Sequence, residues 1–114
     1  MPLPPEIADA AEAALREFCS HHSSPAIADQ LRYTYEINDL TAVLFEQRPG
    51  FLDPSTWTSL PIAKVKYTLA KRQWSLYWSD SNDRWRRLTN VPPTEDIRKL
   101  IQVVADDPLS VFLG

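Results

Sequence analysis

The first part of the chain has the hydrophobic spacing of an amphipathic helix. From Ile7 to Phe18, apolar residues recur every three or four positions, and charged residues occupy many of the positions between them. Prolines stand before and after this run, and imidazole side chains are favourable near a helix C-terminus. The pattern therefore predicts a helix that ends near His21 and His22, with residues 21–29 as a connector.

The next segment alternates apolar and polar positions with a period of two, which is typical of a half-buried strand. One side would carry Leu31, Tyr33, Tyr35 and Ile37, continued after a turn by Leu40, Ala42 and Leu44. Asn38 and Asp39 would form a two-residue turn, so that Ile37 pairs with Leu40. A hairpin with one apolar face follows.

A second hairpin shows the same segregation after a proline-containing loop at residues 48–61. Its apolar side comprises Ala63, Val65, Tyr67 and Leu69, then Trp74, Leu76 and Trp78, whereas Ile62, Lys64, Lys66 and Thr68 point the other way. With Lys71 and Arg72 in the turn, Leu69 would pair with Trp74. Two hairpins with matching apolar faces favour one continuous sheet.

The remaining segments complete the sheet and add a second helix. A short strand is expected from Trp85 to Leu88, but its register stays open because either phase leaves an arginine on the apolar side, unless a β-bulge intervenes. Thr94 is a suitable N-cap for a helix that ends before Pro108. The apolar tail at residues 109–114 is expected to dock on the body of the protein.

The order of these elements predicts an α+β fold. An N-terminal helix, a five-strand antiparallel meander and a C-terminal helix would form a two-layer sandwich, with both helices on the apolar side of the sheet. A chain of 114 residues is long enough to close one core and short for two, so residues 1–114 are expected to form a single domain.

Composition places the protein among ordinary globular proteins, with 44% hydrophobic and 24% charged residues. Cys19 is the only cysteine, so no intrachain disulfide is possible and a reducing compartment is expected. The N-terminal pattern does not resemble a signal peptide, and no run is apolar enough to span a membrane. We therefore expect a soluble, cytoplasmic protein that does not bind membranes.

Four short segments resemble a bacterial family. They are Glu46-Gln47-Arg48-Pro49, Pro61-Ile62-Ala63-Lys64, Trp74-Ser75-Leu76-Tyr77-Trp78, and the closing Asp107-Pro108 with Phe112 and Gly114. In order and rough spacing they are similar to the family catalogued as domain of unknown function 3024, over about Phe18 to the C-terminus. Leu88 and Leu113 stand where the family often has aromatic residues. The resemblance implies a common fold and bacterial origin and leaves the function open.

The sequence lacks the motifs of nucleotide binding, zinc binding and nucleophilic catalysis. With only Gly50 and Gly114, the chain has no glycine-rich loop for a phosphate or dinucleotide. The grouping of Cys19 with His21 and His22 lacks the paired spacing of a zinc site, and no nucleophile elbow is present. No metal, cofactor or catalytic residue is therefore predicted, and the protein is expected not to be an enzyme.

One enzymatic alternative centres on Glu46. Glu46 and Arg48 are two positions apart on a strand and so project from one face, as acid and base do in metal-dependent nucleases. The second metal-binding acid would have to be Asp39 or Asp53. The structural interpretation is an internal ion pair of Glu46 with Arg48 or Arg87, whose disruption would cost about 3–5 kcal/mol at a dry site.

The preferred functional surface is the polar side of the sheet. Residues 32–91 hold nine basic and six acidic residues, together with every Trp and Tyr of the chain. The candidate binding residues on this face and in the 48–61 loop are Arg32, Phe45, Glu46, Arg48, Trp57, Lys64, Lys66, Tyr77 and Arg86. We expect such a face to bind a protein partner or a second copy of the chain, with weak binding of single-stranded nucleic acid as a further alternative.

Overall fold

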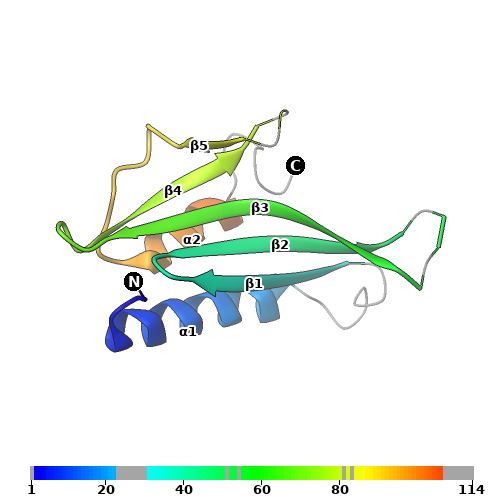
Figure 1. Cartoon of the computed structure of the whole chain (residues 1–114), viewed down its shortest axis with the longest axis horizontal. Helices are drawn as coiled ribbons and strands as arrows, with labels where there is room; N and C mark the ends of the chain where they lie inside the picture. Colours follow the sequence, from blue (N-terminus) through cyan, green and yellow to red (C-terminus); the bar gives the residue numbers. More distant parts are fainter. Residues whose placement is uncertain are drawn as a thin grey trace.

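The structure is a computed structural model of the 114-residue chain and describes residues 2–22, 31–50, 52–53, 55–80, 82 and 84–106. Its elements, in chain order, are α1 (Pro5–His22), β1 (Arg32–Asn38), β2 (Thr41–Pro49), β3 (Trp57–Thr68), β4 (Gln73–Ser79), β5 (Trp85–Arg87) and α2 (Ile97–Asp106). The strands form one antiparallel sheet in sequence order (Figure 1). The predicted α+β class and meander order are confirmed, and α1 ends at the predicted histidines.

Both helices lie against one face of the sheet, which we call the inner face. Its buried side chains include Ala42, Leu44, Ala63, Val65, Tyr67, Trp74 and Leu76 from the strands, which pack with Ala14, Leu15, Phe18, Leu100, Ile101 and Val104 from the helices. Removal of this apolar surface from water is the main stabilising contribution to the fold. Helix α1 runs alongside β1 at one edge of the sheet, and the β2–β3 hairpin extends beyond the other strands (Figure 1).

Both hairpin registers differ from the prediction by two residues. In the first hairpin Ile37 pairs with Ala42, and the turn residues are Asp39 and Leu40. Asp39 has a φ of 52°, a left-handed conformation that aspartate tolerates better than most residues. The predicted turn at Asn38-Asp39 was therefore wrong by one position, although the apolar side chains keep their face.

The second hairpin has a longer turn than predicted. Tyr67, and not Leu69, pairs with Trp74, so the four residues 69–72 connect the strands. Leu69 is consequently exposed in the turn instead of lying on the inner face. A shift of two residues returns every remaining side chain to the same face, because the side-chain period of a strand is two.

Strand β3 begins earlier than predicted and contains a β-bulge. The predicted loop at residues 48–61 contributes its two ends to β2 and β3, and Pro61 lies inside the strand. The bulge follows immediately: Leu44 pairs with Ala63 while Phe45 pairs with Pro61, so Ile62 is the additional residue. A proline is tolerated beside a bulge because the ladder is interrupted there. Ile62 is buried, in contrast to its predicted place beside the lysines.

Helix α2 begins three residues after the predicted N-cap. Asp96, and not Thr94, caps it: the Asp96 carboxylate accepts a hydrogen bond of 3.0 Å from the Arg98 backbone N–H. Thr94 instead forms an isolated antiparallel bridge with Trp74, through backbone hydrogen bonds of 2.7 and 3.0 Å. This bridge ties the chain entering α2 to strand β4.

Two predictions concern residues outside the described ranges, namely most of the 21–29 connector and the docking of the tail at 109–114. Among the helices of the described residues, none is both long and apolar enough to cross a membrane.

Candidate binding surface

The side of the sheet opposite the helices, which we call the outer face, gathers basic and aromatic side chains. Strand positions on this face are fixed by their cross-strand partners, since paired residues point the same way. The charged members are Arg32, Lys64, Lys66, Arg87 and Glu36, and the aromatic members are Phe45, Trp57, Tyr77 and Trp85. Four basic groups against one acidic group give the strands of this face a net charge of +3, although the whole chain carries −3.

One cluster lies where the β2–β3 hairpin extends from the sheet. Trp57 pairs with Pro49, and the guanidinium carbon of Arg32 lies 3.6 Å from the centroid of a Trp57 ring. Beside them, the Gln47 amide donates a hydrogen bond of 3.0 Å to the Ser59 hydroxyl. The bulge at Ile62 creates this arrangement, because without it Trp57 would point to the inner face. The sequence placed Trp57 in a loop and gave no signal of the bulge.

A second cluster is centred on Lys64 in the middle strand. Its ammonium nitrogen lies 5.6 Å from the Tyr77 ring centroid and 5.8 Å from that of Trp85, within the usual range of a cation–π contact. Tyr77 pairs with Lys64 on one side and with Arg87 on the other. Three adjacent strands, β3, β4 and β5, therefore present alternating cations and rings.

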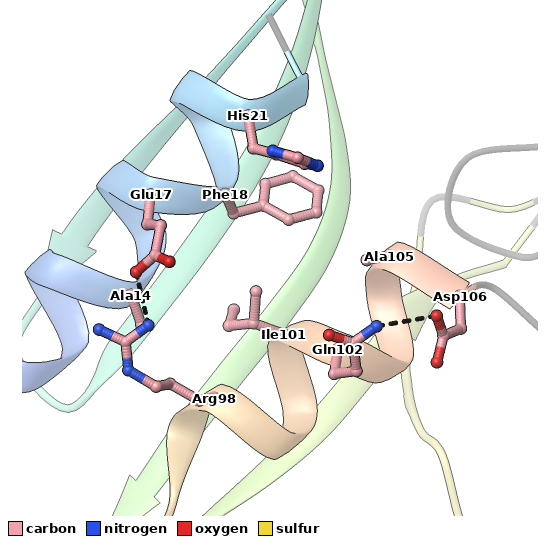
Figure 2. Close-up of a pocket in the computed structure, with 9 residues that line it drawn as sticks. All are labelled: Ala14, Glu17, Phe18, His21, Arg98, Ile101, Gln102, Ala105 and Asp106. Atoms are coloured by element: carbon pink, nitrogen blue, oxygen red, sulfur yellow. Dashed lines mark hydrogen bonds and ion pairs between the residues drawn. The ribbon is translucent and has the colours of Figure 1, made fainter.

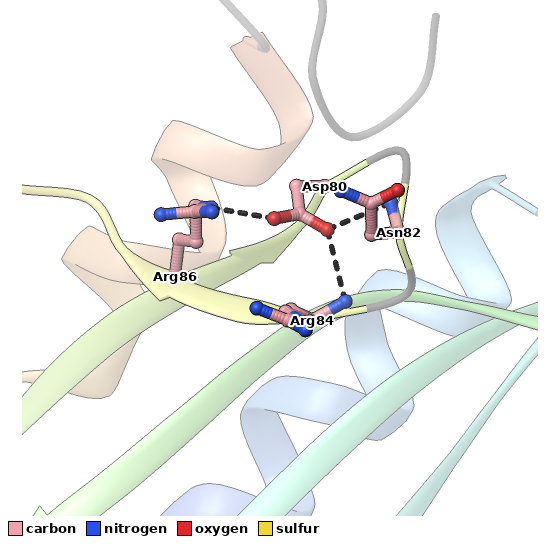
Figure 3. A network of polar contacts seen from close by, with 4 residues as sticks. All are labelled: Asp80, Asn82, Arg84 and Arg86. Atoms are coloured by element: carbon pink, nitrogen blue, oxygen red, sulfur yellow. Dashed lines mark hydrogen bonds and ion pairs between the residues drawn. The ribbon is translucent and has the colours of Figure 1, made fainter.

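The register of β5 corrects the predicted position of one site residue. Arg86 pairs with Trp78 and so lies on the inner side, while Trp85 and Arg87 take the outer face. The Arg86 side chain is held by Asp80, whose carboxylate accepts a hydrogen bond of 2.5 Å from Arg86 Nε (Figure 3). The sequence left this register open, and Asp80 was the available signal, since an acid across a tight turn can pair with an inward arginine.

Asp80 is the centre of this turn. Its carboxylate also accepts hydrogen bonds from the backbone N–H groups of Asn82 and Arg84, at 2.9 and 3.0 Å (Figure 3). Hydrogen bonding to the Arg84 backbone N–H, followed by the Arg86 side chain, lowers the pKa of Asp80 below its ordinary value. The ionised carboxylate therefore orders the β4–β5 turn and fixes which side of β5 faces outward.

Glu46 lies on the inner side of β2, beside Tyr33, whose ring contacts that of Phe18 in α1. It pairs with Tyr33 across the sheet, and its carboxylate accepts a hydrogen bond of 2.5 Å from Arg48 Nε. The predicted ion pair is therefore present, with Arg48 as its partner. It is not a dry pair, because the Arg48 side chain is 63% exposed while that of Glu46 is 12% exposed.

We expect Glu46→Ala to lower the free energy of unfolding by no more than about 1 kcal/mol, because Arg48 keeps its contact with water when the carboxylate is removed. This value replaces the loss of about 3–5 kcal/mol expected for a dry site. Chemical denaturation of the wild type, Glu46→Ala and the isosteric Glu46→Gln measures the difference. A loss above about 3 kcal/mol would show that Arg48 is effectively buried.

The geometry around Glu46 does not assemble the acids of a metal site. Asp39 lies at the opposite end of β2, seven residues and roughly 23 Å away along an extended strand. The Asp53 carboxylate accepts hydrogen bonds from Ser55 and Thr56 within its own turn. Within the described residues, no three His, Cys, Asp or Glu side chains are close enough together to hold a metal ion.

A groove of about 480 Å³ lies between the two helices, away from the outer face. It is lined by Ala14, Glu17, Phe18, His21, Arg98, Ile101, Gln102, Ala105 and Asp106 (Figure 2). The Arg98 guanidinium donates a hydrogen bond of 2.6 Å to Glu17, and this interaction lowers the pKa of Glu17. Because Glu17 belongs to α1 and Arg98 to α2, this ion pair links the two helices across the groove.

The fold and the outer face together define a small α+β protein in which helices cover one side of an antiparallel sheet and a basic, aromatic surface occupies the other. The chain belongs to the family described as Domain of unknown function (DUF3024), whose model matches residues 3–114. No curated protein and no solved structure matches the chain.

Proposed function

We propose that this protein is a non-enzymatic binding domain whose binding surface is the outer face of the sheet, and that its ligand is anionic. One observation carries the proposal: four rings and four cations share a face on which the described helices do not pack. A sheet face with no partner to bind is normally polar and holds few large rings. We expect the protein to function in the reducing cytoplasm of a bacterial cell.

The contacts within the face support binding over a structural role. Lys64 and Arg32 lie over rings, and within the described residues neither forms an ion pair, so their charge is available to a ligand. The side chains of Tyr77 and Trp85 are only half-buried. An anionic ligand would gain from both features at once, since the cations attract it and the rings supply apolar contact area.

A charge-reversed variant tests the surface. We expect Lys64→Glu/Lys66→Glu to fold like the wild type, because neither side chain is in the core, and to lose the ligand. The matched control is Lys71→Glu/Lys99→Glu, which changes the same charges at exposed positions of the β3–β4 turn and of α2. Each variant is immobilised, and the protein and nucleic acid that it retains from a bacterial lysate are measured. The size of each variant in solution is measured separately.

The proposal requires that the wild type and the control retain the same material and that Lys64→Glu/Lys66→Glu does not. Equal retention or equal self-association by all three proteins would show that the outer face is only solvated. The metal-dependent nuclease alternative has no metal site among the described residues, where no three His, Cys, Asp or Glu side chains are close enough together to hold a metal ion.

A further inference from the structure

We propose that the ligand of the outer face is a short single-stranded nucleic acid, whose bases stack on the half-buried rings of this face while its phosphates contact the basic side chains. This inference rests on the proposed function and names its ligand class.

The rings are distributed across the sheet as a stacking platform would require. Phe45 lies on β2, Tyr77 on β4 and Trp85 on β5, so the platform crosses four strands, or roughly 14 Å at the usual strand separation. Antiparallel sheets with helices behind them and aromatic side chains in front can stack two or three unpaired bases. Trp57 offers a further ring on the projecting hairpin, with Arg32 against it.

Two of the cations, Lys64 and Arg87, lie directly beside these rings. Lys64 is within cation–π distance of both Tyr77 and Trp85, and Arg87 is the direct cross-strand neighbour of Tyr77. A strand of nucleic acid alternates flat bases with negative phosphates, so it matches a surface on which rings alternate with positive groups. An acidic peptide would satisfy the cations but would leave the flat ring faces without a specific partner.

The charge of the molecule is polarised in the direction that favours a polyanion. The strands of the outer face carry +3, whereas α1 holds four acidic residues and one arginine on the other layer. With at most four phosphate contacts, log K should fall with log salt with a slope no steeper than about −3. We therefore expect modest affinity that is lost at high salt.

The same face has few groups that could read one base against another. Gln47 and Ser59 are hydrogen-bonded to each other, and the remaining uncharged polar side chains of this face are short hydroxyls, apart from Gln73 and Asn38 near the turns. Stacking without such contacts tolerates every base, because each base has a flat face. We expect little sequence preference.

The test is fluorescence anisotropy with oligo-dT and oligo-U probes of about 12 nucleotides, and with a duplex of the same length, at two salt concentrations. The wild type should bind both single strands and bind the duplex more weakly, since paired bases cannot reach the rings. Tyr77→Ala should weaken single-strand binding roughly tenfold through lost stacking. Lys64→Glu/Lys66→Glu should reduce the salt slope by about 1.4, and Lys71→Glu/Lys99→Glu should bind as the wild type does.

The experiments distinguish a failure of the nucleic-acid inference from a failure of the proposed binding function. If the wild type binds no single strand while the lysate experiment shows a protein lost only by Lys64→Glu/Lys66→Glu, the ligand is a protein and this inference is overturned while the proposed function stands. If the duplex binds as well as the single strand and Tyr77→Ala changes nothing, attraction is purely electrostatic and stacking is refuted. Trp85→Ala, checked for folding by circular dichroism, provides a second ring variant should Tyr77→Ala fail to fold.

Discussion

Replacement of Trp74 by alanine is expected to lower the free energy of unfolding by about 3–5 kcal/mol. Trp74 is 1% exposed and is among the largest fully buried side chains, and its ring centroid lies 5.1 Å from that of Tyr67. Its removal would leave a cavity between the sheet and the helices. Because a domain of this size is normally stable by about 5–15 kcal/mol, this single change should remove a large part of the total. Urea denaturation followed by circular dichroism measures the loss.

The chain offers a matched control for this substitution. Trp57→Ala removes the same side chain from the outer face, where it contacts Arg32, and should cost no more than about 1 kcal/mol. Trp74→Phe should lower the free energy of unfolding by an amount between the losses for Trp74→Ala and Trp57→Ala. Comparable losses for Trp74→Ala and Trp57→Ala would contradict the assignment of Trp74 to the core and Trp57 to the surface.

Cys19 is expected to react with a thiol reagent at pH 8 roughly 100-fold more slowly in the folded protein than in denaturant. Burial raises the pKa of its thiol to about 11, and only the thiolate is the nucleophile. Cys19 lies on α1, partly buried against the core. The measurement is the labelling rate with and without denaturant.

The pH profile of this labelling provides the control. The folded-state rate should rise about tenfold per pH unit and level off near pH 11, whereas the rate in denaturant should level off near the ordinary thiol pKa, about 8.5. Because the folded-state pKa is raised, the stability linked to this thiol is fully present below about pH 8.5 and is lost as the pH rises towards 11. Equal profiles would show that α1 does not shield the thiol.

Most of the outer face could be predicted from the sequence. Alternation alone places Arg32, Phe45, Lys64, Lys66 and Tyr77 on the side opposite the core, and the cross-strand pairs agree. Trp57 and Trp85 could not be placed in this way. The first depends on a bulge and the second on the phase of a strand of only three residues.

The sequence by itself determined the order of the elements, the antiparallel meander and the face on which each side chain of the regular strands lies. A period of two identifies a face without identifying a partner, because a shift of two residues preserves every face; both hairpin registers were therefore decided by their turns and by core packing. The tertiary structure also decided the bulge, which buries Ile62 and turns Trp57 outward. It decided finally that Arg86, and not Arg87, points inward, because Asp80 offers that arginine an ionic partner on the inner side.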